Sequence, residues 1–322
     1  MHMPDRVLTP EVWATLDVAS VGLVGGAVYK TRQRLEPRDA PLMAVMAAFI
    51  FAAQMVNFPV ALGVSGHLIG ATLAAVLLGI GPAVLIMTAV LVIQALVFQD
   101  GGLMALGANV FNLALVAPVV GYLVYGTVLR HARGPASPQV AAFLGAWLSV
   151  VATAAVAGIQ LVLSGYAAIA IIPGILLWHL AIGIGEGLIT VAALQLVWKA
   201  KPEMAPISGE AEPPRIGRTT SVVGLLAVAS VLALALSPLA SPSPDGLERV
   251  AHDAGLAEEF EHEPILPGAL PDYTTPGVEG EAASTAIAGV IGVLLVLIPL
   301  AAVVWLITWG KGQEEETAQD AA

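Results

Sequence analysis

The stretch Ser284–Trp309 reads STAIAGVIGVLLVLIPLAAVVWLITW and contains no charged residue. A helix of about 20 mainly apolar residues is long enough to cross a lipid bilayer. The stretch therefore predicts a transmembrane helix rather than part of a soluble core. The whole chain agrees with this reading, because 57% of its 322 residues are hydrophobic and only 11% are charged, whereas soluble domains carry roughly 25% charged residues.

Outward from this stretch, the sequence predicts nine membrane spans in an all-α polytopic membrane protein. Seven spans form one bundle, and two further transmembrane helices flank an external loop. The third and fourth spans are short and lie beside Pro59, Gly63 and Pro82, so we expect bent or partly re-entrant backbone there. The spans lie near residues 10–29, 40–57, 67–80, 82–98, 103–129, 139–163, 170–198, 219–238 and 284–309.

The thirteen basic residues predict the orientation in the membrane. All except Arg6 and Arg249 fall in alternate loops of the nine-span arrangement, and loops rich in Lys and Arg stay in the cytoplasm. We therefore expect a multi-pass membrane protein with its N-terminus outside and its C-terminus inside. The first residues lack the basic region of a signal peptide, and the large second residue, His2, disfavours removal of Met1.

Composition divides the chain into four parts. Residues 1–198 form the bundle, 199–218 a cytoplasmic linker, 219–309 a second module, and 310–322 a cytoplasmic tail. The second module contains the loop 239–283, which is rich in proline and holds ten acidic residues, so we expect it to be solvated. His252 and His262 lie among these acidic residues, where a charged, solvated surface is a more frequent explanation than a cation site.

Met1 and His2 carry the strongest chemical signal. The terminal amine, the deprotonated backbone nitrogen of His2 and its imidazole can form two fused chelate rings around one metal ion. Such a set is nearly planar, which suits nickel(II) or copper(II) and not zinc, magnesium or calcium. His67 lies at the predicted outer end of the third span, on the same side as Met1, and could supply a fourth nitrogen. The alternative is a disordered His2 and an interfacial His67.

Other polar residues near the predicted outer surface are candidates to orient these imidazoles or, equally, to join helices. In the seventh span, a rise of about 1.5 Å per residue puts His179 ~13 Å and Glu186 ~24 Å deep. We assign Glu186 to coupling or helix packing, and we assign no role to Asp17. The orienting candidates are Ser65, Gln94, Gln99, Asn109, Asn112 and His179.

Alanines recur every four residues along one stripe of the second span, at Ala40, Ala44, Ala48 and Ala52. Small residues allow another helix to approach closely. The stripe fits packing within this chain and contact with a partner protein equally well.

Taken together, residues 1–198 resemble the substrate-binding (S) components of energy-coupling factor nickel and cobalt transporters, the NikM/CbiM family. One departure is Arg6, because the family commonly has glycine there, and a positive φ at this position would strain Arg6. Residues 244–248 also resemble the PDGLE signature of the small N component, which some members carry fused behind the S component (NikMN). The strings that carry the main resemblance are MHMPD (1–5), SGHL (65–68), FQDGG (98–102), GAN (107–109) with Asn112, and GIGEG (183–187).

The resemblance implies that the Met1 amine, the His2 amide and imidazole, and the His67 imidazole bind the transported metal, with no organic cofactor. It also implies three kinds of partner: a transmembrane coupling protein of the EcfT, NikQ or CbiQ type, two ATPase subunits of the NikO or CbiO type, and membrane lipid. Nucleic acid is not expected. The expected substrate is nickel(II), with cobalt(II) as the close alternative.

We expect no enzymatic activity. Gly310-Lys311-Gly312 lacks both the first glycine and the hydroxyl residue of a phosphate-binding loop. An intramembrane hydrolase using His179 and Glu186 would lack a His-Glu-x-x-His pair. A proton-coupled metal permease working through Glu186 is the other less favoured alternative.

Overall fold

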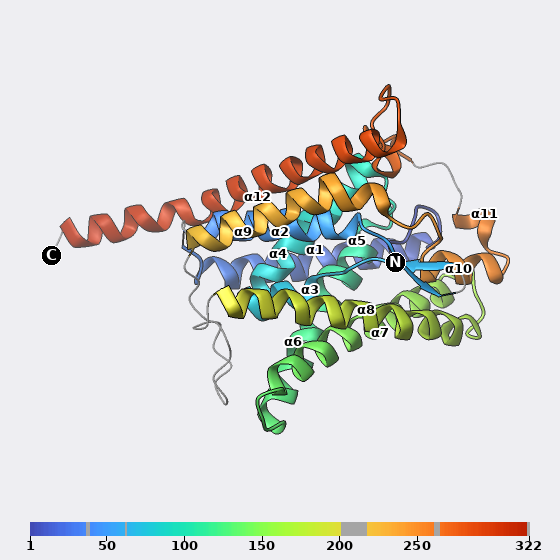
Figure 1. The fold of residues 1–322 in the computed structure, drawn as a ribbon, viewed down its shortest axis with the longest axis horizontal. Helices are drawn as coiled ribbons and strands as arrows, with labels where there is room; N and C mark the ends of the chain where they lie inside the picture. Colours follow the sequence, from blue (N-terminus) through green and yellow to red (C-terminus); the bar gives the residue numbers. More distant parts are fainter. Residues whose placement is uncertain (37–38, 62, 201–217, 261–264, 321–322) are drawn as a thin grey trace.

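The computed structural model describes residues 1–36, 39–61, 63–200, 218–260 and 265–320. The amino-terminal module consists of long apolar helices with short connections (Figure 1). Its elements are α1 (Pro10–Arg32), α2 (Ala40–Gln54), β1 (Phe58–Ala61), β2 (Val64–Gly66), α3 (Ala71–Leu78), α4 (Ile80–Ile93), the π-helix η2 (Gln94–Phe98), α5 (Leu106–Asn109), η3 (Val110–Val116), α6 (Ala117–His131), α7 (Ser137–Leu163) and α8 (Ile171–Ala200).

The C-terminal module contains two long helical segments and a folded connection between them. Its elements are α9 (Arg218–Val231), η5 (Leu232–Leu236), η6 (Ser237–Leu239), α10 (Gly246–Asp253), α11 (Ala257–Phe260), η7 (Pro271–Tyr273) and α12 (Glu281–Asp320). The predicted tail 310–322 is therefore helical as far as Asp320. Most of the predicted linker, residues 201–217, lies outside the described residues.

Among the described residues, six helices are long and apolar enough to cross a membrane, and two shorter apolar helices, Ala40–Gln54 and Val223–Leu239, match the second and eighth predicted spans. The third predicted span is corrected, because α3 is only eight residues long, which gives about 12 Å of helix. The preceding residues, 67–70, are not helical. Gly79, with φ of +89°, then turns the chain into α4.

A short antiparallel hairpin interrupts the otherwise helical amino-terminal module. Strand β1 pairs with β2, with Phe58 opposite Gly66 and Pro59 opposite Ser65. Gly63, with φ of +75°, lies in the turn between the two strands. Strand β2 is fully buried and leads directly to His67.

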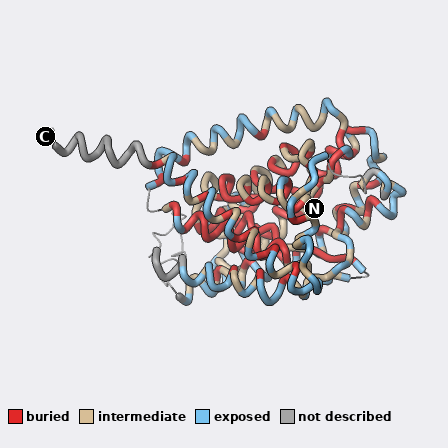
Figure 2. The backbone as a smooth tube through the Cα atoms, turned by 90° about the horizontal axis from the view of Figure 1, so that it is seen from above, coloured by how far each residue is buried: buried red, intermediate tan, exposed pale blue. Residues whose placement is uncertain are grey.

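The second span is enclosed within the chain, because α9 and α12 pack along α2. The alanine stripe is accordingly buried, with exposed fractions of 4% or less at Ala40, Ala44, Ala48 and Ala52. The stripe therefore serves packing within the chain, and the alternative of a partner contact through these alanines is not supported. Figure 2 shows the buried residues gathered inside the bundle and exposed residues on the outward side of the helices.

The connection between the two helices of the C-terminal module is exposed over most of its described residues, as the sequence predicts, but α10 is packed against the rest of the chain. Helix α10 packs against α8 and β2, and its Leu247, Val250 and Ala251 are buried. These apolar residues occupy one face of a short helix. The acidic, proline-rich sequence around that helix gives no indication that it is buried. The His252 side chain is 76% exposed, as expected, whereas His262 lies outside the described residues.

Candidate metal centre

The residues before α1 are held inside the bundle by hydrogen bonds to the backbone of Met3. Asn109 accepts from the Met3 N–H at 2.8 Å and donates to the Met3 carbonyl at 3.0 Å. The Gly102 N–H donates to the same carbonyl at 2.8 Å. The buried Asp5 carboxylate accepts from the Met104 N–H at 2.7 Å. Asn109 thus holds the amino-terminal backbone and does not contact an imidazole.

Arg6 adopts a φ of +69°. In this left-handed region a residue with a Cβ pays roughly 1–2 kcal/mol, whereas glycine does not. The one departure from the family pattern therefore falls at a backbone position that does need a positive φ.

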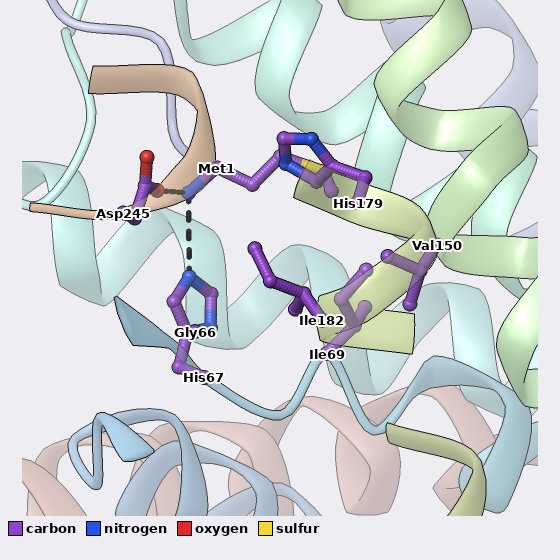
Figure 3. A pocket seen from close by; sticks show the side chains of 8 residues that line it. All are labelled: Met1, Gly66, His67, Ile69, Val150, His179, Ile182 and Asp245. Atoms are coloured by element: carbon purple, nitrogen blue, oxygen red, sulfur yellow. Dashed lines mark hydrogen bonds and ion pairs between the residues drawn. The ribbon is translucent and has the colours of Figure 1, made fainter. Parts of the chain in front are cut away.

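The amino terminus meets His67 (Figure 3). The Met1 nitrogen lies 3.4 Å from His67 Nε2 and forms an ion pair with Asp245. His67 Nδ1 lies 3.1 Å from the Leu68 carbonyl, so it carries the proton and leaves Nε2 as the electron-pair donor. Burial, the positive Met1 amine and His2 lower the pKa of His67 to about 3. His67 is therefore neutral at neutral pH, as a metal ligand must be.

His2 lies beside His67, but its chelating nitrogen is turned elsewhere. The two rings are parallel, with centroids 5.4 Å apart and an interplanar angle of 7°. His2 Nδ1 is 2.8 Å from Asp100 Oδ1, and the buried Nε2 has no hydrogen-bond partner among the described residues. A fused chelate needs Nδ1, so the ring has to rotate away from Asp100 before the set predicted from the sequence can close.

Asp100 and Tyr273 are residues that the sequence reasoning did not assign to the centre. Tyr273 donates a short hydrogen bond to Asp100 Oδ2. Burial raises the pKa of Asp100, but the charge and hydrogen bond of His2 outweigh it and hold the pKa below its ordinary value. Only the FQDGG string pointed to Asp100, and nothing in the sequence pattern pointed to Tyr273.

Gln94 reaches the centre indirectly. Its Nε2 donates to the Tyr273 hydroxyl at 3.1 Å and to Gln54 Oε1 at 2.7 Å. Gln54 in turn donates to the Ile69 carbonyl at 2.9 Å. Because Tyr273 bonds Asp100 and Ile69 follows His67 closely, this chain of hydrogen bonds joins the supports of the two histidines.

The remaining polar candidates join segments of the chain and do not contact an imidazole. Asn112 and Gln160 exchange two hydrogen bonds of 2.8 Å between η3 and α7. Gln99 Nε2 lies 3.4 Å from the Leu266 carbonyl. Ser65 donates its hydroxyl to the Ser243 carbonyl at 2.6 Å. Gln99 and Ser65 thus dock the C-terminal module.

Helix α8 contributes at two depths. His179 lines the same small cavity as Met1, His67 and Asp245, and its Nδ1 lies 2.6 Å from the Ile175 carbonyl (Figure 3). The buried Glu186 lies further along the helix and bonds the backbone just after His67, so it is not placed to ligate a metal at Met1. In the first span, Asp17 accepts from the Gly107 N–H at 2.8 Å.

The space beside the amine suits a single ion. The cavity has a volume of about 10 Å³, which is roughly one water-sized sphere. Within the part of the chain that the structure describes, no three His, Cys, Asp or Glu side chains converge on one point.

Comparison with known proteins agrees with this architecture. A family described as the cobalt uptake substrate-specific transmembrane region, CbiM, matches residues 2–204, and the PDGLE domain matches residues 219–309. The chain belongs to the CbiM family.

Relatives of this CbiM-family chain share its fused organisation. It is 37% identical over 301 residues to a fused nickel transport protein, NikMN, of Archaeoglobus fulgidus, covering 92% of this chain and 96% of the relative. The fused nickel transport protein NikMN of Rhodobacter capsulatus is 32% identical, covering 73% of this chain and 72% of the relative. A crystal structure of a transition metal transporter matches with a TM-score of 0.58 and 33% identity, covering 63% of this chain and 95% of that chain.

The CbiM-family chain is thus a multi-pass membrane subunit for nickel or cobalt transport with a PDGLE module, and it is a transporter component and not an enzyme. The family and fold class that the sequence predicts are confirmed.

Proposed function

We propose that this CbiM-family chain captures nickel(II) at the outer face of a prokaryotic cell membrane, as the substrate-binding subunit of an energy-coupling factor importer. The observation that carries the proposal is the 3.4 Å separation between the Met1 nitrogen and His67 Nε2, beside the stacked His2 ring. The terminal amine of Met1 is an unusual metal ligand, because most protein metal sites are built from side-chain donors.

The proposed ligands are four nitrogen atoms. They are the Met1 amine, the deprotonated His2 amide, His2 Nδ1 after rotation of the ring away from Asp100, and His67 Nε2. Four nitrogens in one plane favour nickel(II) over ions that prefer oxygen or tetrahedral ligands. The small cavity beside the amine and His67, of about 10 Å³, is consistent with a single ion as substrate.

Cobalt(II) is the alternative substrate, because the family description names cobalt while the fused relatives are named for nickel. The two metals differ in a measurable way in this ligand set. A planar nickel(II) complex is yellow and diamagnetic, so absorbance and magnetic measurements on the loaded protein identify it. A paramagnetic nickel complex of higher coordination number would contradict the planar set.

We infer that the amino terminus faces outward and the C-terminus lies in the cytoplasm. The distribution of basic residues supports this orientation, and the C-terminus lies at the far end of the molecule from the amino terminus (Figure 1). Inward delivery then requires a transmembrane coupling protein of the EcfT, NikQ or CbiQ type and two ATPase subunits of the NikO or CbiO type.

Nickel titration of the purified chain, with any tag at its C-terminus, tests the proposal. One extra residue before Met1 converts the amine into an amide, so we expect this variant to lose nickel binding as completely as His67→Ala. His252→Ala is the matched control, because that exposed histidine lies away from the cavity. Unchanged affinity after the amino-terminal extension would overturn the proposed ligand set.

A further inference from the structure

Two side chains of the C-terminal module reach the proposed metal ligands. The Asp245 carboxylate pairs with the Met1 amine, and the Tyr273 hydroxyl bonds Asp100, which holds His2 Nδ1 at 2.8 Å. We propose that Asp245 and Tyr273 are positioning residues for these ligands, so that the amino-terminal module alone holds its metal ligands less firmly in place. This inference rests on the proposed function of Met1 and His2 in metal binding.

The Asp245 carboxylate is fixed by the helix that it caps. Oδ1 accepts from the N–H groups of Leu247 at 2.7 Å and Glu248 at 2.9 Å. The Glu248 side chain accepts from the Asp245 N–H at 2.9 Å, which completes a capping box. Because the helix uses Oδ1, the second oxygen is left to the Met1 amine.

The strand that leads to His67 also places Asp245. The Ser65 N–H donates to the Pro244 carbonyl at 2.9 Å, so β2 holds the residue immediately before Asp245. On the other side of Asp245, a Cβ added to Gly246 would lie 2.9 Å from Ile182 Cδ1 and 3.1 Å from His179 Cε1. The glycine therefore allows α10 to approach α8 closely enough for Asp245 to reach the amine.

Tyr273 is presented by an unfavourable backbone. Asp272 and Tyr273 have φ values of +49° and +56°, a region that residues with a Cβ seldom adopt. Two consecutive residues in this conformation persist only when their surroundings hold them there. The contacts of the Tyr273 side chain, with Phe98 and Asp100, are among the interactions that hold this strained backbone.

The half-buried Tyr273 ring packs against aromatic side chains, and its hydroxyl donates to Asp100. Its centroid lies 4.9 Å from that of Phe98 and 6.1 Å from that of Phe51. Gln94 donates to the hydroxyl oxygen at 3.1 Å, so the phenol proton is free to go to Asp100. The phenol thus fixes the carboxylate that faces His2.

The negative charge of Asp245 does not by itself explain why this residue should strengthen metal binding. Metal binding removes one proton from the ammonium and one from the His2 amide and adds a doubly charged cation, so the charge beside Asp245 stays at one positive unit. The attraction to the carboxylate is therefore similar before and after loading. What remains is placement, because holding a terminal residue in position in advance reduces the entropy lost on binding.

Two conservative substitutions separate positioning from folding. Asp245→Ser keeps a good helix cap but removes the oxygen that meets the amine, and Tyr273→Phe keeps the ring but removes the hydroxyl. In the full-length chain with a free N-terminus, we expect each to weaken nickel binding by about 10- to 100-fold. Asp253→Ser, on the exposed side of the same helix, and Tyr166→Phe, at an exposed tyrosine, are matched controls and should bind nickel like the original chain.

A second measurement reports position without metal. Acylation of the Met1 amine in the metal-free chain should become several-fold faster in Asp245→Ser and stay unchanged in Asp253→Ser. If Tyr273 acts through Asp100, then adding Tyr273→Phe to Asp100→Asn should cause no further loss of nickel affinity. An unchanged acylation rate overturns the role of Asp245, and additive losses overturn that of Tyr273.

Failure of the proposed function and failure of the positioning role of Asp245 and Tyr273 give different experimental results. If the original chain binds neither nickel nor cobalt, the proposed function fails. If it binds the metal and both Asp245→Ser and Tyr273→Phe bind it equally well, the proposed function survives and the positioning role of the C-terminal module is wrong.

Discussion

The Glu186 carboxylate accepts a hydrogen bond of 2.6 Å from the backbone N–H of Ile69, two residues after His67. It accepts a second, of 2.9 Å, from the N–H of Gly70. Through these bonds, the middle of α8 holds the non-helical segment that carries a proposed metal ligand. This gives physical content to the coupling role assigned to Glu186, because a displacement of α8 would displace His67.

Glu186→Gln should weaken metal binding. The glutamine amide has one oxygen and one donor nitrogen, so one of the two backbone N–H groups loses its acceptor, at a cost of about 1–3 kcal/mol. If about half of this cost is felt as displacement of His67, nickel affinity falls roughly two- to tenfold. Titration calorimetry measures it, with Thr190→Val on the same helix as control, because the Thr190 hydroxyl has no partner among the described residues. Unchanged affinity would contradict the support of His67 by Glu186.

Asn109→Ala should loosen the amino terminus. It removes both side-chain hydrogen bonds to Met3, and we expect nickel affinity to fall by at least about tenfold, as for other residues that orient ligands. Asn112→Ala is the informative comparison, because among the described residues the Asn112 side chain bonds Gln160 alone, and its loss leaves that amide unpaired. It should lower the melting temperature and leave nickel affinity in place. Equal nickel affinities of the two variants would contradict the role of Asn109.

Arg6→Gly should stabilise the chain. Relief of the left-handed conformation is worth roughly 1–2 kcal/mol, and the greater freedom of glycine in the unfolded chain offsets about 0.5–1 kcal/mol of it. A net gain of about 0.5–1 kcal/mol is expected in thermal unfolding, with no loss of nickel affinity. Arg249→Gly places glycine inside α10 and should have the opposite sign. A lower melting temperature for Arg6→Gly would show that the arginine side chain, and not its backbone, matters at this position.

Nickel affinity should rise with pH. Burial lowers the pKa of the Met1 amine more than the Glu248 and Asp100 carboxylates raise it, and the metal competes with the proton on this nitrogen. The amine contribution therefore increases up to its lowered pKa and then levels off, at a lower pH than for a free amine. His67, with a pKa of about 3, is already neutral near pH 6 and adds no slope there. Titrations between about pH 5.5 and 8 check this. Because the His2 amide also loses a proton on binding, affinity keeps rising above the pKa of the amine, and amine ligation adds a steeper slope below that pKa. The same slope throughout this range would contradict amine ligation.

The sequence predicts the membrane helices because length and apolar composition are local properties. Span 284–309 and span 139–163 correspond closely to α12 and α7. The third span is predicted wrongly, because residues 67–70 are apolar enough to count toward a span but are not helical. Glu186, on a helix distant in the sequence, accepts hydrogen bonds from the backbone of this segment. Hydropathy does not distinguish such a segment from the first turn of a helix.

In the metal centre, too, some residues are predictable from the sequence and others are not. Met1, His2 and His67 belong to short strings whose chemistry is evident on its own. Asp245 and Tyr273 gain their place only from contacts across most of the chain, and the acidic surroundings of Asp245 predicted a solvated loop. No local pattern records that an aspartate capping a short helix also faces the amino terminus.

The ion pair between Met1 and Asp245 joins residues 244 positions apart. During synthesis, Met1 leaves the ribosome long before Asp245 exists, and all the helices of the amino-terminal module are translated in between. The contact is therefore made only late in translation, and a truncated product that ends before α10 carries its first residue without the carboxylate that anchors it.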